Sequence, residues 1–281
     1  MKLCCPLDGE PLVLTDRVWR CMQGHSFDVA KQGYVNLLPV QKKRSKDPGD
    51  SKAMVEARAQ FLAGGYYQPF AHALAHWAST VEIGTVLDAG CGEGYYLREF
   101  VAAAGKSNSS AQLEVAGLDI SKWAVLAAAK HAKQCASFRS VPATWLVASN
   151  SHIPLAEHSI NTVLCLFGFP VSNEFKRVLA ATGRVVMLDP AAQHLQELKQ
   201  IIYPNVHEKE YQLPLPTAEW QLEHEQRVTF QFTLPNPQAI HNLLVMTPHL
   251  YRASAEGRAR AESLHTLTLT ADAWLRVFTP T

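Results

Sequence analysis

The sequence predicts an α/β protein with a doubly wound, mostly parallel sheet and a small additional module at the N-terminus. From about residue 70 onward, short apolar runs alternate with amphipathic stretches of helix length, which is typical of repeated strand–helix units. A glycine-rich turn, DAGCGEG at residues 88–94, directly follows the first of these apolar runs. The first 37 residues are instead rich in cysteine and turn-forming residues, and they contain few periodic stretches.

Length and composition suit a globular protein. A chain of 281 residues is long enough for one sizeable domain and a small module. With 47% hydrophobic and 18% charged residues it is not of the disordered class, and a formal charge of +1 argues neither for nor against a nucleic-acid partner. No secretory signal, membrane-length apolar stretch or disulfide framework is evident. We therefore expect a cytoplasmic protein without a membrane partner.

These features divide the chain into three predicted parts. Residues 1–37 form a small zinc-knuckle-like module, residues 38–69 a basic linker and a helix, and residues 70–281 the α/β domain. The linker helix is expected at 52–63, with Asp50 or Ser51 as its N-cap and glycines at its end.

The α/β domain is predicted as an alternation of elements. The parallel strands are expected at residues 85–88, 113–118, 145–147, 162–166 and 183–188. The helices are expected at residues 70–79, 95–103, 122–131 and 174–179. Two late segments, 227–234 and 265–269, alternate polar and apolar residues, which favours antiparallel strands.

The turn at residues 88–94, called the cofactor turn below, indicates the ligand. Gly90 and Gly92 allow the backbone to approach a nucleotide-like ligand closely. A dinucleotide site would place its third glycine later, and Asp88 and Glu93 would repel a pyrophosphate. The sulfonium and ammonium groups of S-adenosylmethionine are cationic and suit these carboxylates. Asp119 follows the second strand, where it can accept hydrogen bonds from ribose hydroxyls.

Four residues of the N-terminal module have the spacing of a small zinc site. Two pairs of candidate ligands, Cys5 with Asp8 and Cys21 with His25, are separated by a turn-forming stretch. Asp8 stands where a second thiolate would be expected, and a carboxylate makes a harder, weaker zinc ligand. Cys4 is an alternative ligand. A metal-free module held together by apolar packing is an equal alternative.

A basic run, defined as Lys42, Lys43, Arg44 and Lys46, lies in the linker. Such a run is commonly a solvated connector, but it can also contact the phosphates of a nucleic acid.

Residues 23–51 carry a family resemblance. The segments QGHSFDVAKQGYVNLLPV at 23–40 and KRSKDPGDS at 43–51 resemble the bacterial large-subunit ribosomal RNA (guanine-N1)-methyltransferases. The resemblance is dense over the first hundred or so residues and patchy afterwards. It implies a zinc-binding N-terminal domain on a class I, S-adenosylmethionine-dependent methyltransferase domain, and a homodimer. The resemblance also favours RNA binding as the role of the basic run.

The resemblance also implies roles for particular residues. Its zinc ligands map onto the four residues named above, with Asp8 as the departure. Its cofactor contacts map onto Tyr67, Gly92, Glu93 and His194. The reaction it implies is methylation of N1 of a guanine in ribosomal RNA. That nitrogen carries a proton at neutral pH, so a base is needed. Asp189 at the end of the fifth strand is the candidate, and a turn-capping aspartate is its alternative role.

The target base must be unstacked before its N1 can be reached. Three aromatic residues are candidates for stacking on it: Phe167, Phe169 and Tyr203. The segment 166–170 around the first two is apolar where amino-methylating enzymes usually carry polar residues. Two other functions therefore stay open: methylation of a small molecule or a protein, and RNA binding without catalysis on a retained fold.

Overall fold

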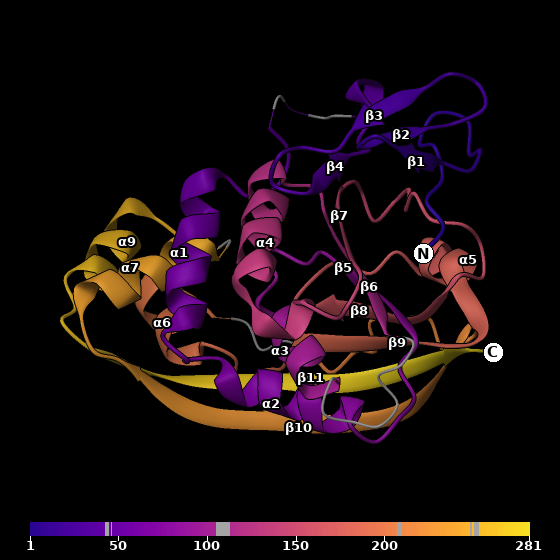
Figure 1. Cartoon of the computed structure of the whole chain (residues 1–281). Coiled ribbons are helices and arrows are strands. Elements are labelled where there is room, and N and C mark those ends of the chain that lie inside the picture. The colour runs from indigo at the N-terminus through magenta and orange to yellow at the C-terminus, as the bar shows by residue number, and fades with distance from the viewer. Residues whose placement is uncertain (43–44, 46, 105–112, 207–209, 248, 250–252) are drawn as a thin grey trace.

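The computed structural model shows an eight-stranded mixed sheet that runs through the whole molecule (Figure 1). It describes the chain except residues 43–44, 46, 105–112, 207–209, 248 and 250–252. In spatial order the sheet contains β10 (Trp220–Leu234), β11 (Leu267–Pro280), β9 (Leu179–Pro190), β8 (Ile160–Leu166), β5 (Thr85–Ala89), β6 (Glu114–Asp119), β7 (Ala143–Val147) and β4 (Tyr34–Asn36).

The central strands are the five that the sequence predicts, and they are parallel to one another. β5 lies between β6 and β8, so the chain first adds strands on one side of β5 and then on the other. In open α/β sheets a ligand binds at the carboxyl ends of the strands on both sides of such a reversal. The cofactor turn leaves β5 at this point.

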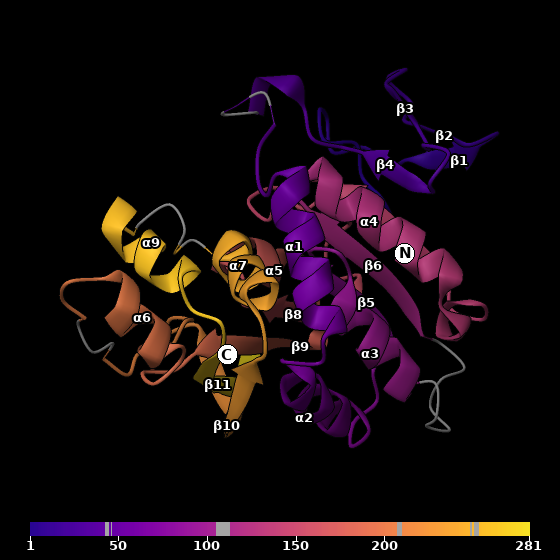
Figure 2. The same cartoon turned by 90° about the vertical axis from the view of Figure 1, so that its left-hand side faces the viewer.

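The helices that surround the sheet are α1 (Lys52–Ala63), α2 (Gln68–Ala78), α3 (Tyr95–Ala104), α4 (Lys122–Gln134), α5 (Ser172–Val178), α6 (Gln196–Ile202), α7 (Pro237–Met246) and α9 (Ala255–Glu262). α1 begins with Ser51 as its N-cap, whose side chain accepts a hydrogen bond from the Met54 N–H at 3.3 Å, and it ends before Gly64. Figure 2 shows α1 to α4 on one side of the sheet, with α6, α7 and α9 grouped at one end.

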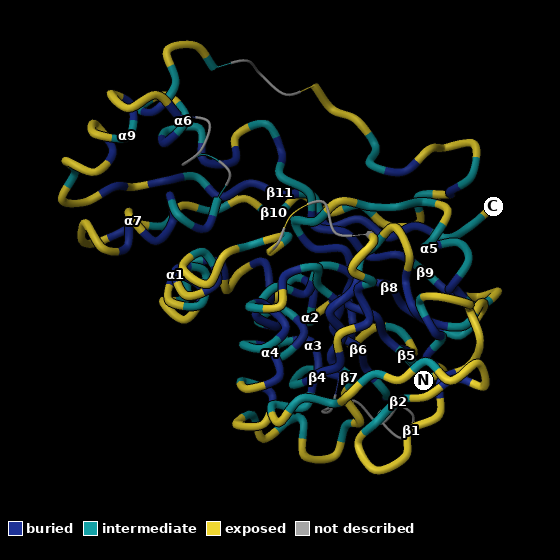
Figure 3. Tube along the Cα trace, turned by 90° about the horizontal axis from the view of Figure 1, so that it is seen from above, coloured by how far each residue is buried: buried dark blue, intermediate teal, exposed yellow. Residues whose placement is uncertain are grey.

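The two faces of the sheet are covered differently. Val86 points into a core that it shares with α1 to α4, α6 and α7, whereas its neighbour Leu87 points into a second core. That second core is filled by Phe175 of α5 and by residues of the N-terminal module, among them Leu3 and Leu12. The module therefore occupies a place where a doubly wound fold would have further helices. Figure 3 shows that the buried residues concentrate along the central strands of the sheet.

The N-terminal module contains β1 (Val13–Thr15), β2 (Val18–Arg20) and β3 (Ser26–Asp28) in a three-stranded antiparallel sheet. β4 then leaves the module and pairs in parallel with β7 at the edge of the large sheet. The predicted division of the chain at residue 37 stays a prediction, but β4 ties the two parts together by backbone hydrogen bonds.

The C-terminal region is more regular than the sequence predicts. The antiparallel strands at 227–234 and 265–269 are part of a longer pair, β10 and β11, in register from Trp220–Pro280 to Leu234–Leu267. The prediction ended the last strand too early because Asp272 and Arg276 interrupt its apolar pattern. In the structure both side chains are buried, and each is paired with a charged residue of β10. The helices α7 and α9 between the two strands were not predicted.

Candidate active site

The cofactor turn is shaped by three glycines in left-handed conformation. Gly90, Gly92 and Gly94 have φ values of +97°, +54° and +82°, which side chains with a Cβ rarely adopt. The N–H groups of Gly90 and Cys91 both donate to the carbonyl of Leu118 on β6, at 2.8 and 2.9 Å. The turn is thereby held against the end of β6, as expected for a loop that presents its backbone to a ligand.

Two predicted carboxylates lie beside this turn: Asp88 is buried, and Asp119 is half-buried. Asp119 accepts the N–H of Gly92 at 3.0 Å with one oxygen and the N–H of Ser121 at 2.8 Å with the other. Burial and the neighbouring charge of Asp119 raise the pKa of Asp88 to about 8. Burial also raises the pKa of Asp119, although the two N–H groups oppose the shift. Two adjacent carboxyls with raised pKa values, one buried and one half-buried, favour a positively charged ligand between or beside them.

Glu93 directs its side chain towards α3 and α4. Its buried carboxylate accepts hydrogen bonds from Arg98 Nη2 at 3.0 Å and from His131 Nδ1 at 2.7 Å. These groups line a pocket between α1, α3 and α4. The predicted contact of Glu93 with the cofactor stays a prediction, but its carboxylate is engaged by Arg98 and His131.

Tyr67 and His194 contact each other across the carboxyl ends of the strands. Tyr67 Oη lies 3.2 Å from His194 Nε2, and His194 Nδ1 accepts the backbone N–H of Asp272 at 3.2 Å. Burial lowers the pKa of His194 to about 3, so the ring is neutral. Because Nδ1 accepts, the single ring proton is on Nε2 and is donated to Tyr67. The Tyr67 hydroxyl therefore keeps its own proton for another acceptor.

His194 lies in the turn before α6, two residues before that helix begins at Gln196. The turn is closed by Leu195, which has a φ of +54° and whose N–H donates to Thr270 of β11 at 2.8 Å. The carboxylate of Asp272, fully buried on β11, accepts the N–H of Gln193 at 3.0 Å. Sequence reasoning missed this support from β11, because the strand lies far along the chain.

Phe167 brings an aromatic ring to the same place. It follows β8 with a φ of +53°, a conformation that costs energy for a residue other than glycine. Its ring centroid lies 5.9 Å from Tyr67, 5.5 Å from Phe70, 6.0 Å from Tyr96 and 5.8 Å from His194. This group is called the aromatic cluster below.

The other two stacking candidates lie differently. Phe169 is 88% exposed, and its carbonyl accepts a hydrogen bond from Asn150 Nδ2 at 3.4 Å. Tyr203 follows α6, and its hydroxyl lies 2.9 Å from His249 Nδ1. The Phe167 ring contacts the predicted cofactor residues Tyr67 and His194.

Asp189 lies at the end of β9, as predicted, opposite Trp274 of β11. The guanidinium of the buried Arg276 lies 3.8 Å from its carboxylate and also donates to Glu225 at 2.7 Å. The carboxylate thus has a structural ion pair as well as its predicted catalytic role. Its function as a base stays a prediction.

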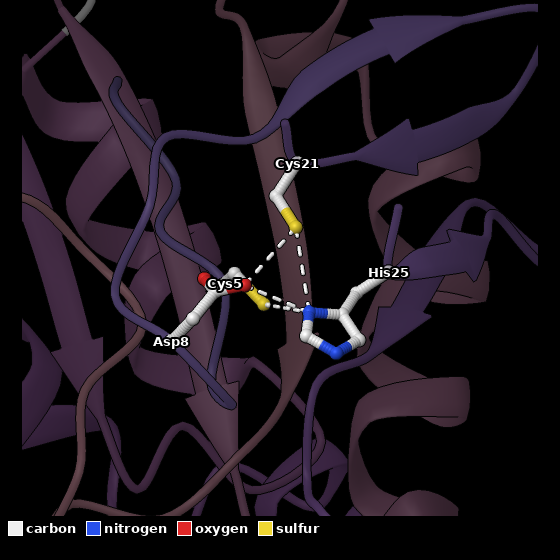
Figure 4. Close-up of side chains that lie close together, drawn as sticks. All are labelled: Cys5, Asp8, Cys21 and His25. Atoms are coloured by element: carbon white, nitrogen blue, oxygen red, sulfur yellow. Dashed lines mark hydrogen bonds and ion pairs between the residues drawn. The ribbon is translucent and has the colours of Figure 1, made fainter. Parts of the chain in front are cut away.

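The four predicted zinc ligands converge in the N-terminal module (Figure 4). Asp8 Oδ2 lies 2.7 Å from His25 Nδ1 and 3.2 Å from Cys21 Sγ, and Cys5 Sγ lies 3.5 Å from His25 Nδ1. All four donor atoms lie within 4.8 Å of one another. Ligands of a tetrahedral zinc ion are about 3–4 Å apart, so this donor set fits the ion. Cys4 is not a member of this group.

Local backbone structure explains the convergence. β2 ends at Arg20 and β3 begins at Ser26, so Cys21 and His25 lie at the two ends of one hairpin loop. Gly24 turns this loop with a φ of +88°, and the Cys21 N–H donates to the His25 carbonyl at 3.1 Å. None of the six cysteines forms a disulfide in the structure.

Three of the four residues of the basic run, Lys43, Arg44 and Lys46, lie outside the described residues. Lys42 ends the short 3-10 helix η1 (Val40–Lys42). In the part of the chain that the structure describes, no helix is long and apolar enough to span a membrane.

Comparison with known protein families identifies both parts of the chain. A family model described as a methyltransferase domain matches residues 86–189, which extend from β5 to the end of β9. A zinc-ribbon model described as RlmA, N-terminal, matches residues 3–46. The fold, the cofactor turn and these matches define a class I, S-adenosylmethionine-dependent methyltransferase with an N-terminal zinc ribbon.

Individual relatives narrow the class to a family. A proposed 23S rRNA (guanine-N1)-methyltransferase of Micromonospora griseorubida is 35% identical over 214 residues, which are 69% of this chain and 67% of that protein. A protein of Bacillus subtilis with the same proposed activity is 29% identical over 285 residues, 95% of this chain and 93% of its own. The 23S rRNA (guanine(748)-N1)-methyltransferase of Streptomyces fradiae is 34% identical over 202 residues, which are 69% of this chain and 65% of that protein. The chain belongs to this family of 23S rRNA (guanine-N1)-methyltransferases, and the predicted class, cofactor and family are confirmed.

Proposed function

We propose that the protein transfers the methyl group of S-adenosylmethionine to N1 of a guanine in a loop of large-subunit ribosomal RNA. The observation that carries this proposal is the similarity to the Bacillus subtilis relative, which covers both the zinc ribbon and the methyltransferase domain. A methyltransferase of a small molecule would have no evident use for the ribbon, whereas a zinc module beside the domain can contact RNA.

When bound, S-adenosylmethionine supplies an electrophilic methyl group. In our proposal Asp119 accepts the ribose hydroxyls. Each of its oxygens holds one N–H and keeps a second lone pair for this purpose. Asp88 lies next to the cationic half of the ligand. Two buried polar atoms, Tyr96 Oη and Asn150 Oδ1, have no partner among the residues that the structure describes, and both fit a polar ligand at the turn.

The aromatic cluster supports a flat acceptor. A guanine extruded from a loop loses its stacking partners, and Phe167 at the end of β8 offers it an aromatic face. The proton of N1 must leave before or during methyl transfer, and we assign its removal to Asp189. The carboxylate is held by Arg276, so it has a defined position.

The remaining parts of the proposal concern partners. We assign the basic run to phosphate contacts, because it joins the ribbon to the methyltransferase domain. We also expect a homodimer, as the family resemblance implies, and a place in the cytoplasm where ribosomal RNA is modified. Light scattering of the purified protein measures its oligomeric state directly.

The experiment that tests the function uses the full chain, labelled S-adenosylmethionine and transcribed large-subunit ribosomal RNA. N1-methylguanine blocks the Watson–Crick edge, so reverse transcription should stop next to one defined guanine. Asp189→Asn should lower the rate of methylation and leave cofactor binding intact. Labelling of a small molecule or protein in an extract without labelling of RNA would favour the first alternative function. Binding of RNA without any binding of S-adenosylmethionine would favour the second.

A further inference from the structure

Arg58 reaches the cofactor turn from outside the predicted site. It lies on α1, in the segment between the zinc ribbon and the methyltransferase domain. Its Cδ is 3.7 Å from the position that a Cβ on Gly92 would take, so the guanidinium stem packs against the middle of the turn. Nothing in the sequence around this arginine distinguishes it from an ordinary surface residue of a helix.

The guanidinium is anchored at one end and unsatisfied at the other. Arg58 Nη2 donates to Asp50 Oδ2 at 2.6 Å and to the carbonyl of Met246, at the end of α7, at 3.0 Å. Its Nε is buried and has no hydrogen-bond partner among the residues that the structure describes. A buried N–H of a charged group without an acceptor is costly. A ligand that supplies an acceptor at this point would therefore gain affinity.

The electrostatic environment indicates the charge of that acceptor. Burial raises the pKa values of Tyr67, Tyr96 and Asp119, and the positive charge of Arg58 lowers each of them. The positive charge of Arg58 therefore acts on side chains from three elements of the site: the N-cap of α2, α3 and the end of β6. The other arginine next to the turn, Arg98, is engaged by the carboxylate of Glu93. The one anionic group of S-adenosylmethionine is the carboxylate of its methionine half.

We propose that Arg58 binds the carboxylate of the methionine half of S-adenosylmethionine through its Nε–H, while Asp50 and Met246 hold the guanidinium in place. The proposal rests on the methyltransferase function. It gives the linker a role in cofactor binding, because Asp50 belongs to the linker and Arg58 to the helix that follows it. A charge-assisted hydrogen bond to a carboxylate is stronger than a neutral one, so the contact should be measurable.

Decarboxylated S-adenosylmethionine tests this contact, since it keeps the adenosine, the sulfonium and the amine but lacks the carboxylate. Calorimetry on the full-length wild type should show about ten- to hundredfold weaker binding of the decarboxylated compound. In Arg58→Gln the affinity for S-adenosylmethionine should fall by a similar factor, while the affinity for the decarboxylated compound changes little. The ratio of the two affinities should then approach one. Arg58→Lys keeps the charge but not the Nε–H, and its ratio should be intermediate.

Arg260→Gln is the matched control, because Arg260 on α9 also donates to a backbone carbonyl, that of Ile201, although it does so through Nε, whereas Arg58 donates to Met246 through Nη2. Its ratio should equal that of the wild type. A wild-type ratio near one would overturn the proposal without any variant, which matters if Arg58→Gln fails to fold. A ratio of the two affinities as large in folded Arg58→Gln as in the wild type would also overturn it. This holds as well if the variant loses only affinity for RNA. Binding of neither compound would refute the methyltransferase function as well.

Discussion

The raised pKa of Asp88 predicts that cofactor binding depends on pH. Burial and the charge of Asp119 raise this pKa from 3.8 to about 8, so Asp88 is mostly protonated at pH 7 in the unliganded protein. A cationic ligand next to the carboxyl stabilises its charged form and lowers its pKa. If the charged form alone binds S-adenosylmethionine, affinity falls about tenfold per pH unit below 8. It should be about a hundredfold weaker at pH 6 than above pH 9.

The same shift predicts a proton release. At pH 7 a group with a pKa of about 8 is about nine-tenths protonated, so binding should release about 0.9 proton. Calorimetry in two buffers of different ionisation enthalpy measures this number directly. The neighbouring thiols of Cys91 and Cys165 should not contribute to this proton release. Burial is the main cause that raises their pKa values, and it moves them further from neutrality.

Asp88→Asn is the control for this prediction. It should bind the cofactor more weakly and lose most of the pH dependence, with a remainder from Asp119, whose pKa burial also raises. The stability of the unliganded wild type should depend on pH in the opposite direction to the affinity, and should fall as the pH rises. A raised carboxyl pKa stabilises the fold fully below the unfolded pKa of 3.8, and this contribution is lost as the pH rises through about 8. Constant wild-type affinity between pH 6 and pH 9 would refute the reasoning.

Three further predictions concern other parts of the site. Asp119→Ala should weaken binding of S-adenosylmethionine by about 1.5–3 kcal/mol. Gly92→Val should abolish it, because valine is strained at a φ of +54°; calorimetry that gives wild-type affinity for both would contradict the site. Replacing the basic run with alanines should weaken RNA binding and flatten its salt dependence at constant cofactor affinity, and an unaltered salt slope would make the run a plain linker. Asp8→Cys should raise zinc affinity and stabilise the ribbon. Elemental analysis and zinc titration check this, and equally tight zinc in both proteins would show that Asp8 is not a weak ligand.

The central sheet could be predicted because its information is local. Each of the five central strands is a short apolar run, and all of them except β7 are followed by a helix. The cofactor turn could be predicted for the same reason, since its glycines and Asp88 are contiguous and its chemistry depends on backbone conformation. The four candidate zinc ligands also lie within 21 residues of one another, so their spacing alone indicated that they would meet.

What escaped prediction depends on contacts between distant residues. β11 contains Asp272 and Arg276, and two charges in a strand predict that it is partly exposed. In the structure Asp272 pairs with Arg227, and Arg276 pairs with Glu225. Likewise, the role of Arg58 depends on distant contacts: Asp50 and the end of α7 hold its guanidinium, and its Cδ lies next to Gly92. A single sequence does not contain the pairing that makes such buried charges tolerable.

The state of His194 shows how such distant support bears on chemistry. Histidine in a methyltransferase that acts on a protonated nitrogen is an obvious candidate for the base. Here the backbone N–H of Asp272 occupies Nδ1, and burial lowers the pKa of the ring to about 3. The remaining nitrogen carries the proton and faces Tyr67. His194 therefore acts as a neutral donor that orients the Tyr67 hydroxyl, and the proton of guanine N1 has to leave by another group, for which Asp189 is our assignment.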